Sequence, residues 1–454
     1  MAGAKKGRYH RLSVDLFNRH GPTYESHLFG TRYINTRDTK NLQAFLAKNC
    51  DDYGKNATQR AAMLPLLGWG ILSSDGPEWK KSRDLVKPLF KRAEVGDIDR
   101  VEKYVDKMIK LLPRDGSTVD LAPMLQKLAI DSSTEFIFGH SLNCLDDETG
   151  NADEFLQAFD QALAGAGRRG TLAAGKLMFL FKPDDKKWLE NCKRVHAFVD
   201  SWIARALAED PDSKSSATSP SQQQQQQHYI LVNEMSKKIK DPVRLRSELL
   251  NIFSPSRGTT TALMSNTLFY LARAPAVWKE LRRQALDLGD TPITFEVLKT
   301  LHLFRYALQE AIRLQGPSGQ VHRQALRDTV LPRGGGPAGA SPILVPKGTI
   351  VVGNNYPIYH DPEIWGDDVE EFRPSRFYGK VLTWEFVPFL GGPRICPAQQ
   401  QVYTNGVYLL YRLVREFETL ENRDPCLEYV EEMGMLCQSR NGVKVAVHRA
   451  TDSE

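Results

Sequence analysis

The stretch Phe386-Val-Pro-Phe-Leu-Gly-Gly-Pro-Arg-Ile-Cys396-Pro-Ala-Gln-Gln places one cysteine at the end of a turn that glycine and proline constrain. The residues that follow predict a helix that begins at Cys396 and runs to about Phe417. Backbone N–H groups and the positive end of a helix dipole stabilise a thiolate at such a position. Gly391 and Gly392 allow the backbone to approach a flat molecule closely. The stretch therefore predicts a thiolate that ligates a soft metal, rather than a structural cysteine at a helix start.

The composition of the 454-residue chain is that of an ordinary globular protein, with 41% hydrophobic and 25% charged residues. Its formal net charge of +5 is small for this length, so we expect no nucleic-acid partner. A mildly basic surface favours an acidic partner or an anionic membrane. The six cysteines form no CxxC pair, which predicts reduced thiols and no disulfide framework.

The spacing of apolar residues predicts a chain that is mainly α-helical with a small β part, and 454 residues are enough for one large domain or for two or three small ones. Residues 211–228 contain a run of six glutamines and predict a low-complexity loop that joins two helical stretches. The predicted elements are helical spacing over about 101–207, helices over about 241–273 and 295–314, and β-strands over 343–345 and 349–352.

The pattern Phe389-x-x-Gly392-x-Arg394-x-Cys396 resembles the haem-binding signature of the cytochrome P450 superfamily, in which a cysteine thiolate is the proximal ligand of haem b. These four residues are expected to coincide by chance in roughly one chain per thousand of this length. Ala398 stands where the family has glycine, which is a small departure. The resemblance implies a single catalytic domain over residues 1–454 with the cytochrome P450 fold, in which haem lies between a long central helix and the cysteine loop. It also implies that Cys396 ligates the iron, that Phe389 shields the sulfur and that Arg394 pairs with a haem propionate.

Glu310-x-x-Arg313 matches a second motif of the family. The i, i+3 spacing places both side chains on one face of a helix. In the family this pair joins an arginine of a later loop, which here is Arg376. A buried charge trio is costly unless every member is paired. The resemblance therefore implies a buried trio that locks the cysteine loop in place, rather than a solvated surface pair.

Trp79-x-x-x-Arg83 matches a third motif of the family. The spacing of one helical turn lets both side chains reach the same haem propionate. Arg323 matches the propionate-binding arginine of the first strand after the Glu-x-x-Arg helix. The resemblance thus implies that Trp79, Arg83 and Arg323 help to bind the cofactor.

Three further segments, 66–79, 331–336 and 341–345, resemble the fungal branch of alkane and fatty-acid hydroxylases. This branch implies a lipophilic small-molecule substrate, either fatty-acid-like or a fungal secondary metabolite. It also implies an NADPH-dependent flavoprotein reductase as electron donor. A membrane anchor is expected to precede this stretch and to hold the catalytic domain on the cytosolic face of the endoplasmic reticulum. Within the sequence itself, no run of about 18 apolar residues occurs that would predict a transmembrane helix. We also expect the protein to be a monomer.

Two surfaces are expected around this cofactor. An acidic reductase is expected to dock on a basic helix that follows Trp79, although a solvated charged face explains its outer lysines equally well. Phe253 and an apolar cluster before that helix are expected to line a lipophilic pocket. The basic residues are Lys80, Lys81, Arg83, Lys87, Lys91 and Arg92, and the apolar cluster is Met63, Leu64, Leu66, Leu67 and Trp69.

The central helix departs from the family pattern Ala/Gly-Gly-x-Asp/Glu-Thr-Thr. Alignment places Gly258 at the acid and Thr259 at the first threonine. The acid normally relays protons to bound oxygen through water, and glycine cannot do so. Arg257 is cationic at any working pH and is a poor relay. Pro255 lacks an N–H, so we predict a helix that is broken or bulged at about 254–258.

Two functional hypotheses follow. The first is a haem-thiolate monooxygenase or oxidase in which Thr259 still hydrogen-bonds the bound oxygen species. The second is a redox-neutral or peroxide-using enzyme, such as an isomerase, dehydratase or cyclase, because the acid is replaced by Gly258. A haem protein without catalytic activity is a third and weaker alternative.

Overall fold

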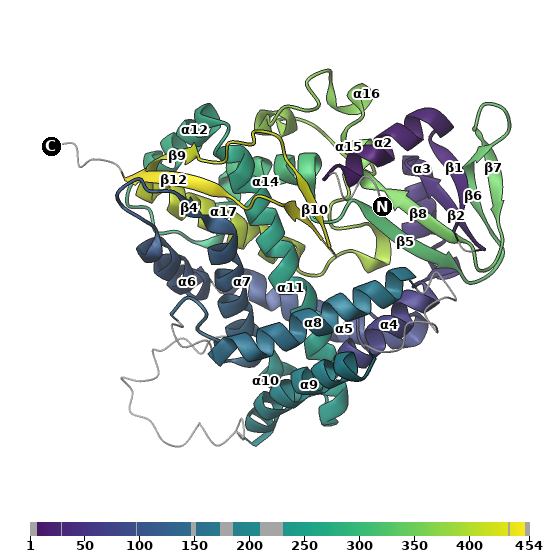
Figure 1. Cartoon of the computed structure of the whole chain (residues 1–454), viewed down its shortest axis with the longest axis horizontal. Coiled ribbons are helices and arrows are strands. Elements are labelled where there is room, and N and C mark those ends of the chain that lie inside the picture. Colours follow the sequence, from purple (N-terminus) through teal and green to yellow (C-terminus); the bar gives the residue numbers. More distant parts are fainter. Residues whose placement is uncertain are drawn as a thin grey trace. The chain divides into compact units, whose positions relative to one another are not determined.

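Figure 1 shows the computed structural model, which describes residues 7–28, 30–96, 98–146, 151–172, 185–208, 230–434 and 436–449. The chain divides into two compact units. Met1–Ala57, Val105–Gln126 and Gly258–Glu454 form the first unit, and Thr58–Tyr104 and Lys127–Arg257 form the second. The predicted loop 211–228 lies outside the described residues. Helices dominate the described chain and the strands form small sheets, which confirms the predicted fold class.

The largest sheet lies in the first unit and has the strand order β1-β2-β8-β5-β3. Strands β2 and β8 are parallel, and the other neighbours are antiparallel. The central strand β8 reads Ile-Val-Val-Gly-Asn and is buried throughout, as a strand covered on both faces must be. The strands are β1 (Thr23–Leu28), β2 (Thr31–Thr36), β3 (Tyr53–Gly54), β5 (Gln320–Ala325) and β8 (Ile350–Asn354).

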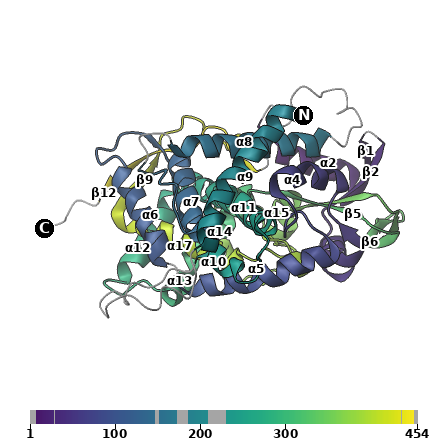
Figure 2. The same ribbon diagram turned by 90° about the horizontal axis from the view of Figure 1, so that it is seen from below.

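Three smaller sheets complete the strands described in the first unit. Hairpin β6–β7 extends beside β1 and β2 (Figures 1 and 2). Strands β7 and β8 confirm the strands predicted at 343–345 and 349–352. The small sheets are β6 (Thr329–Gly335) with β7 (Ser341–Val345), β4 (Val119–Asp120) with β12 (Lys444–Arg449) and β9 (Phe417–Asn422), and β10 (Glu431–Met433) with β11 (Cys437–Ser439).

The helices of the first unit include one predicted element that the structure corrects. The single helix predicted over 295–314 is wrong, because Leu301 leaves the helical region with a ψ of 65° and buries its side chain. The α-helices that lie wholly in this unit are α2 (Tyr9–His20), α3 (Thr39–Gln43), α12 (Pro275–Asp287), α13 (Phe295–Thr300), α14 (His302–Gln315), α15 (Asn355–Tyr359), α16 (Pro362–Trp365) and α17 (Gln399–Glu416).

The second unit is helical, and α8 packs along α9 (Figure 1). Its core is aromatic: Phe253 contacts the rings of Phe155 and Phe159 at centroid distances of 5.9 and 5.1 Å. No helix in the described part of the chain is long and apolar enough to span a membrane. The helices of this unit are α4 (Ala57–Leu67), whose first residue belongs to the first unit, α5 (Gly76–Gly96), α8 (Asn151–Leu172), α9 (Asp185–Ala208) and α10 (Leu231–Ser236). Helices α6 (Ile98–Leu111), α7 (Leu121–Phe138) and α11 (Pro242–Leu271) contribute residues to both units.

Helix α11 is continuous, so the predicted break at 254–258 is wrong. Pro255 removes one backbone hydrogen bond, a cost of about 3 kcal/mol in a helix interior. Side-chain interactions in the turn before the proline oppose this cost. Leu250 and Phe253 are fully buried, and the Asn251 amide donates to the carbonyls of Leu67 and Ser247 at 2.9 and 2.8 Å. The burial of this helix therefore keeps the backbone helical through the proline.

Candidate functional site

The cysteine loop is a closed turn that precedes α17. The Cys396 N–H donates to the Phe389 carbonyl at 3.0 Å, and the Leu390 N–H donates to the Val387 carbonyl at 3.0 Å. Leu390 adopts a left-handed conformation with φ 65°, which is rare for a residue with a side chain. These contacts fix the backbone on both sides of the turn and hold Cys396 in one place before the helix.

Gly392 is required in this turn for two reasons. Its φ of 69° lies in the left-handed region that favours glycine. A β-carbon at this position would also collide with the Leu46 carbonyl oxygen. The loop therefore approaches the backbone of residues 44–48 more closely than any larger residue permits.

An aromatic pair supports the loop from α17. The Phe389 ring meets the Tyr403 ring edge-on at 5.2 Å, and the Arg305 guanidinium lies 4.6 Å from the centre of the Tyr403 ring. Burial raises the pKa of Tyr403 to about 12, so this phenol is neutral at physiological pH. Phe389 is thereby fixed seven residues before Cys396, at the carbonyl that accepts the cysteine N–H.

The predicted charge trio is present and buried. Arg313 donates to both Glu310 carboxylate oxygens at 2.8 and 2.9 Å, and the Arg376 Nε donates to Glu310 Oε1 at 3.0 Å. Glu310 and Arg313 are 0% exposed. Burial alone would lower the pKa of Arg376, but hydrogen bonds to Asp368 and Glu310 and the charge of Glu310 raise it. The structure therefore confirms the trio as a paired network rather than a surface pair.

Tyr359 joins the trio to the cysteine loop. The Arg313 Nη1 donates to the Tyr359 carbonyl at 2.8 Å, and the Val387 N–H donates to the Tyr359 hydroxyl oxygen at 3.1 Å. The Phe386 ring packs on the Tyr359 ring at 5.1 Å. A continuous set of hydrogen bonds thus leads from Glu310 through Arg313 and Tyr359 to the start of the loop.

The remaining predicted cofactor contacts lie on separate elements. Arg394 is half-buried in the turn of the cysteine loop, and Arg323 is buried on β5, where its Nη1 donates to the His322 carbonyl at 2.9 Å. Trp79 and Arg83 lie one turn apart on α5 of the second unit, with Trp79 half-buried and Arg83 buried. The loop therefore brings together Phe389, Arg394 and Cys396, whereas Arg323, Trp79 and Arg83 come from other elements.

Within the second unit, α5 is tied to α11 by a buried carboxylate. The Ser82 hydroxyl donates to Glu248 Oε1 at 2.6 Å, and the Arg244 Nη2 lies 2.6 Å from the same oxygen. Glu248 is 0% exposed, and burial raises its pKa despite these two partners. This contact fixes the helix that carries Trp79 and Arg83.

The departure from the family motif is visible on α11. Thr259 follows Gly258 in the helix, and a β-carbon built on Gly258 would lie 2.9 Å from the Leu436 Cδ1. Arg257 forms an ion pair with Asp160 of α8, and its guanidinium lies 4.9 Å from the centre of the Phe159 ring. Burial lowers the pKa of Arg257 to about 10, so it stays cationic at neutral pH. Position 258 therefore carries no carboxylate, and the guanidinium of the neighbouring Arg257 is paired with Asp160.

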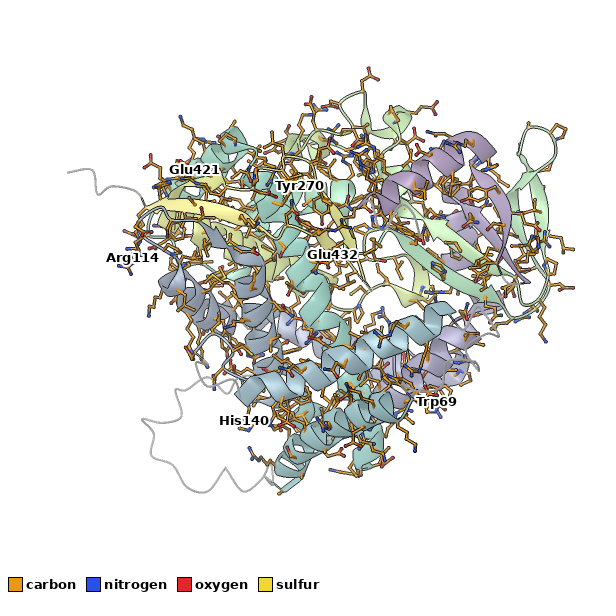
Figure 3. The ribbon with its side chains drawn as sticks, in the orientation of Figure 1. Trp69, Arg114, His140, Tyr270, Glu421 and Glu432 are labelled. Atoms are coloured by element: carbon orange, nitrogen blue, oxygen red, sulfur yellow. The ribbon has the colours of Figure 1, made fainter. Side chains whose placement is uncertain are left out.

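The predicted pocket residues divide into core and surface. Leu66 and Leu67 are almost fully buried on α4, and Phe253 belongs to the aromatic core of the second unit. The Trp69 side chain is 48% exposed after the end of α4 (Figure 3).

Sequence reasoning missed four residues that contact or adjoin predicted site residues, each within its own unit: Tyr359, Ser82, Glu248 and Leu436. Tyr359 stands in no motif, and its role depends on a backbone carbonyl as well as its hydroxyl. Glu248 and Leu436 acquire their contacts from segments far apart in the sequence. The only local signal for Glu248 was its position four residues after Arg244 on the same helix. An exposed i, i+4 ion pair gives the same sequence pattern, so this signal does not predict burial.

The residues of the loop fit a haem whose iron takes a thiolate ligand. The chain offers a half-buried cysteine in a turn that only glycine can form, with an arginine two residues before it. Cys437, by contrast, lies on β11, is fully buried, and its sulfur accepts from the Gln315 amide at 3.0 Å. Burial raises the pKa of the Cys437 thiol to about 12, which disfavours a thiolate there.

Known proteins resemble this chain along almost its full length. The cytochrome P450 family model matches residues 2–445. The cytochrome P450 monooxygenase himC of Aspergillus japonicus is 35% identical over 98% of this chain and 79% of its own length. The cytochrome P450 monooxygenase iccC of Talaromyces variabilis is 36% identical over 99% of this chain and 88% of its own. The cytochrome P450 monooxygenase tenA of Beauveria bassiana is 34% identical over 95% of this chain and 84% of its own.

Proposed function

Since the chain belongs to the cytochrome P450 superfamily and is a haem-thiolate oxidoreductase of the monooxygenase type, we propose that Cys396 supplies the axial thiolate and that the substrate is a lipophilic fungal secondary metabolite or fatty-acid-like compound. One observation carries the assignment of Cys396. The loop before it is closed by its own N–H on the Phe389 carbonyl and is linked through Tyr359 to the buried Glu310–Arg313–Arg376 trio. Such a support makes the thiolate position rigid.

Haem b supplies a redox-active iron that binds and activates oxygen. The protein supplies the surroundings. Phe389 excludes water from the sulfur side, and Arg394 and Arg323 neutralise the propionates. We also assign Trp79 and Arg83 of α5 to propionate binding, on the family motif that they match.

On the oxygen side, Thr259 holds a proton at its hydroxyl, whereas Gly258 has no group that can move one. Ser256 is a poor replacement for the acid, because its hydroxyl donates to the Phe253 carbonyl at 2.9 Å. Ser254 and Thr260 remain as hydroxyls that order water along α11. A hydroxyl or carboxyl group of the substrate is a further proton source.

The electron donor is a redox partner, as P450 monooxygenases require, and a flavoprotein reductase that uses NADPH fits a fungal enzyme. Lys80, Lys81, Lys87 and Lys91 are exposed on α5 and form the basic face to which we assign its docking. Lys80 and Lys81 are paired with Asp84 and Glu78 at 2.7 and 2.6 Å, so Lys87 and Lys91 carry more of this attraction. The side chain of Arg92 lies outside the described residues. Attachment to the endoplasmic reticulum and a monomeric state belong to the same proposal.

One set of assays tests the proposed function. The purified protein is expected to give the long-wavelength Soret band of a carbon monoxide haem-thiolate complex. Candidate lipophilic substrates are then incubated with NADPH and reductase under oxygen, with peroxide alone, and without oxidant. Product that requires oxygen and reductase is expected. Product formed without any oxidant would instead establish the redox-neutral alternative, and absence of the long-wavelength band would refute the haem-thiolate site.

A further inference from the structure

Three side chains of the kinds that bind metal ions meet within the first unit, outside the cysteine loop. His10 comes from α2, Glu431 from β10 and Cys437 from β11. One ligand atom of each lies within 4.8 Å of the other two, and the three residues are 2%, 3% and 0% exposed. Figure 3 labels Glu432, the next residue on β10. His10 and Glu431 are 421 residues apart in the sequence, so only the tertiary structure forms this cluster.

Gln315, the last residue of α14, completes a group of four. Its Nε2 lies 3.0 Å from the Cys437 sulfur and 3.3 Å from His10 Nδ1, and its amide also hydrogen-bonds to the Glu431 side chain. An amide NH₂ group has two hydrogens, so it cannot serve three acceptors at once. The group therefore presents more acceptors than its donor can satisfy, which is an arrangement that favours a cation.

The dimensions of the group are close to those of a tetrahedral zinc site. Bonds of about 2.0–2.3 Å to the ion place the four ligand atoms about 3.3–3.8 Å from one another. The contacts of Gln315 measure 3.0 and 3.3 Å, and the other three separations are at most 4.8 Å. Rotation of the Gln315 amide by about 180° brings its oxygen to the place of its nitrogen. Binding then requires the other side chains to move inward by about 1 Å.

Neighbouring contacts already orient two of these side chains. The His10 ring stacks on the Tyr356 ring, with 5.0 Å between the ring centroids. A β-carbon at Gly319 would lie 2.6 Å from His10 Nε2, so glycine at this position leaves room for the ring. The His10 backbone N–H donates to the Glu431 carboxylate at 2.9 Å, which holds that side chain beside α2. Outer contacts of this kind strengthen a metal site, because they order the ligands before the ion binds.

The donor atoms select the class of ion. Imidazole nitrogen, thiolate sulfur and two oxygens suit Zn²⁺, whereas Ca²⁺ and Mg²⁺ prefer oxygen ligands throughout. The charges of one thiolate and one carboxylate cancel that of the ion, as a buried site requires. Without the ion Cys437 is a thiol, so binding replaces its S–H bond by a bond to zinc and releases one proton to solvent. Cys437 thus needs the charge of the ion itself to ionise, whereas the turn before α17 favours the thiolate of Cys396.

We propose that His10, Glu431 and Cys437, with Gln315 as the fourth ligand, form a structural Zn²⁺ site that fastens α2 to hairpin β10–β11. Four protein ligands leave no open position on the ion, so its role is to stabilise the fold. The residue before α2, Arg8, provides no side-chain cap, and Glu431 supplies an acceptor to the first turn instead. The site is independent of the proposed function, because it contains no residue of the cysteine loop or of the charge trio.

Zinc binding by the haem-loaded protein is the direct test. After removal of metal by a chelator and dialysis, the protein is expected to bind one Zn²⁺ per chain, measured by elemental analysis and by competition with a coloured chelator. A free Zn²⁺ concentration one hundred times Kd should raise Tm by about 3 °C. X-ray absorption at the zinc edge, which is separate from that of haem iron, should show one sulfur at about 2.3 Å and nitrogen or oxygen at about 2.0–2.2 Å.

Matched substitutions identify the ligands. Cys437→Ser and His10→Gln should each weaken Zn²⁺ binding by roughly a hundredfold or more, since loss of a residue that merely orients a ligand already costs about ten- to a hundredfold. The controls are the half-buried Cys426 and the buried His360, which stacks on the same Tyr356 ring as His10 does. Cys426→Ser and His360→Gln should leave the affinity for Zn²⁺ unchanged. The Soret band of the carbon monoxide complex verifies that each variant is folded.

Three results would overturn the inference. The first is haem-loaded protein that binds no Zn²⁺. The second is bound Zn²⁺ without a sulfur neighbour, or with the same affinity in Cys437→Ser and His10→Gln as in the unsubstituted protein. The third is equal weakening in the two control variants, which would point to general loss of structure rather than loss of ligands. Protein that binds Zn²⁺ as expected but lacks the long-wavelength Soret band would refute the proposed function and leave this site standing.

Discussion

Two cysteines of the first unit show how surroundings decide the chemistry of a thiol. Cys396 is half-buried in a loop that glycine and a left-handed leucine shape, whereas Cys437 is fully buried in a strand and accepts a hydrogen bond. A thiolate needs positive potential, and burial in apolar surroundings opposes it. The difference in environment therefore favours Cys396 as the metal ligand.

Substitution of these two cysteines separates their roles. Cys396→Ser is expected to abolish the long-wavelength Soret band of the carbon monoxide complex, because a serine hydroxyl is not ionised at neutral pH. Cys437→Ser is expected to keep that band and to lower thermal stability, since it places a more polar group at a fully buried position. Absorption spectra of the reduced protein with carbon monoxide measure both. A band that survives in Cys396→Ser and disappears in Cys437→Ser would reverse the assignment.

The charge trio gives a second prediction at this scale. Arg376→Ala removes one partner of a fully buried carboxylate and should cost about 3–5 kcal/mol of unfolding free energy. The neighbouring Arg373 pairs with Asp368 at 2.6 Å but is half-exposed, so Arg373→Ala should cost less than about 1 kcal/mol. Denaturant unfolding measures the difference. Haem content should also fall in Arg376→Ala but not in Arg373→Ala, because Tyr359 connects the trio to the cysteine loop by hydrogen bonds. Equal losses of haem in the two variants would contradict this role of the trio.

At the scale of elements, α11 shows how packing overrides a local signal. Its sequence contains both Pro255 and Gly258, yet the helix continues from Pro242 to Leu271. Buried side chains lie on both sides of the proline. Tyr270, which Figure 3 labels near the end of α11, stacks on the Phe372 ring with 5.3 Å between the ring centroids. The proline therefore costs one hydrogen bond without ending the helix.

The contact between α5 and α11 gives a prediction with a pH dependence. Ser82→Ala removes a donor to buried Glu248 and should cost about 1–3 kcal/mol. Burial already raises the pKa of Glu248 above its value in the unfolded chain. Between these two pKa values the folded state binds more protons than the unfolded state, so the stability that this group contributes falls as pH rises. Removal of Ser82 raises that pKa further, so the loss should be larger at pH 8 than at pH 5.

A serine on another helix provides the control for this experiment. The Ser133 hydroxyl donates to the Ile130 carbonyl within its own helix at 3.1 Å, so Ser133→Ala should cost less than about 1 kcal/mol at either pH. Urea unfolding at the two pH values measures both variants. A Ser82→Ala loss that is independent of pH would show that Glu248 does not titrate with this contact.

At the scale of the whole molecule, buried histidines predict sensitivity to acid. Burial lowers the pKa of His10 to about 4 and that of His360 to about 3. An unfolded histidine titrates near 6.5, so between these values the unfolded chain binds more protons and stability falls as pH falls. Each histidine should remove about 2 kcal/mol of unfolding free energy between pH 7 and pH 5.

Glutamine substitutions isolate this effect. His10→Gln and His360→Gln should each flatten the dependence of unfolding free energy on pH below 6.5, whatever they cost at pH 7. His140 is exposed (Figure 3), and His140→Gln should leave the slope unchanged. Denaturant unfolding at pH 5, 6 and 7 measures the slopes. Identical slopes in all four proteins would mean that other groups govern the response to acid.

The sequence by itself determined the cysteine loop, the charge trio and the mainly helical class, because each depends on residues at short spacing or on motifs whose residue types are chemically constrained. It placed Cys396, Glu310, Arg313 and Arg376 correctly within that loop and trio. Only the tertiary structure decided that α11 stays continuous, since the energy that opposes Pro255 comes from burial. It also decided that Tyr359 links the trio to the loop and that Leu436 meets Gly258, because contacts between distant segments leave no local pattern in the sequence.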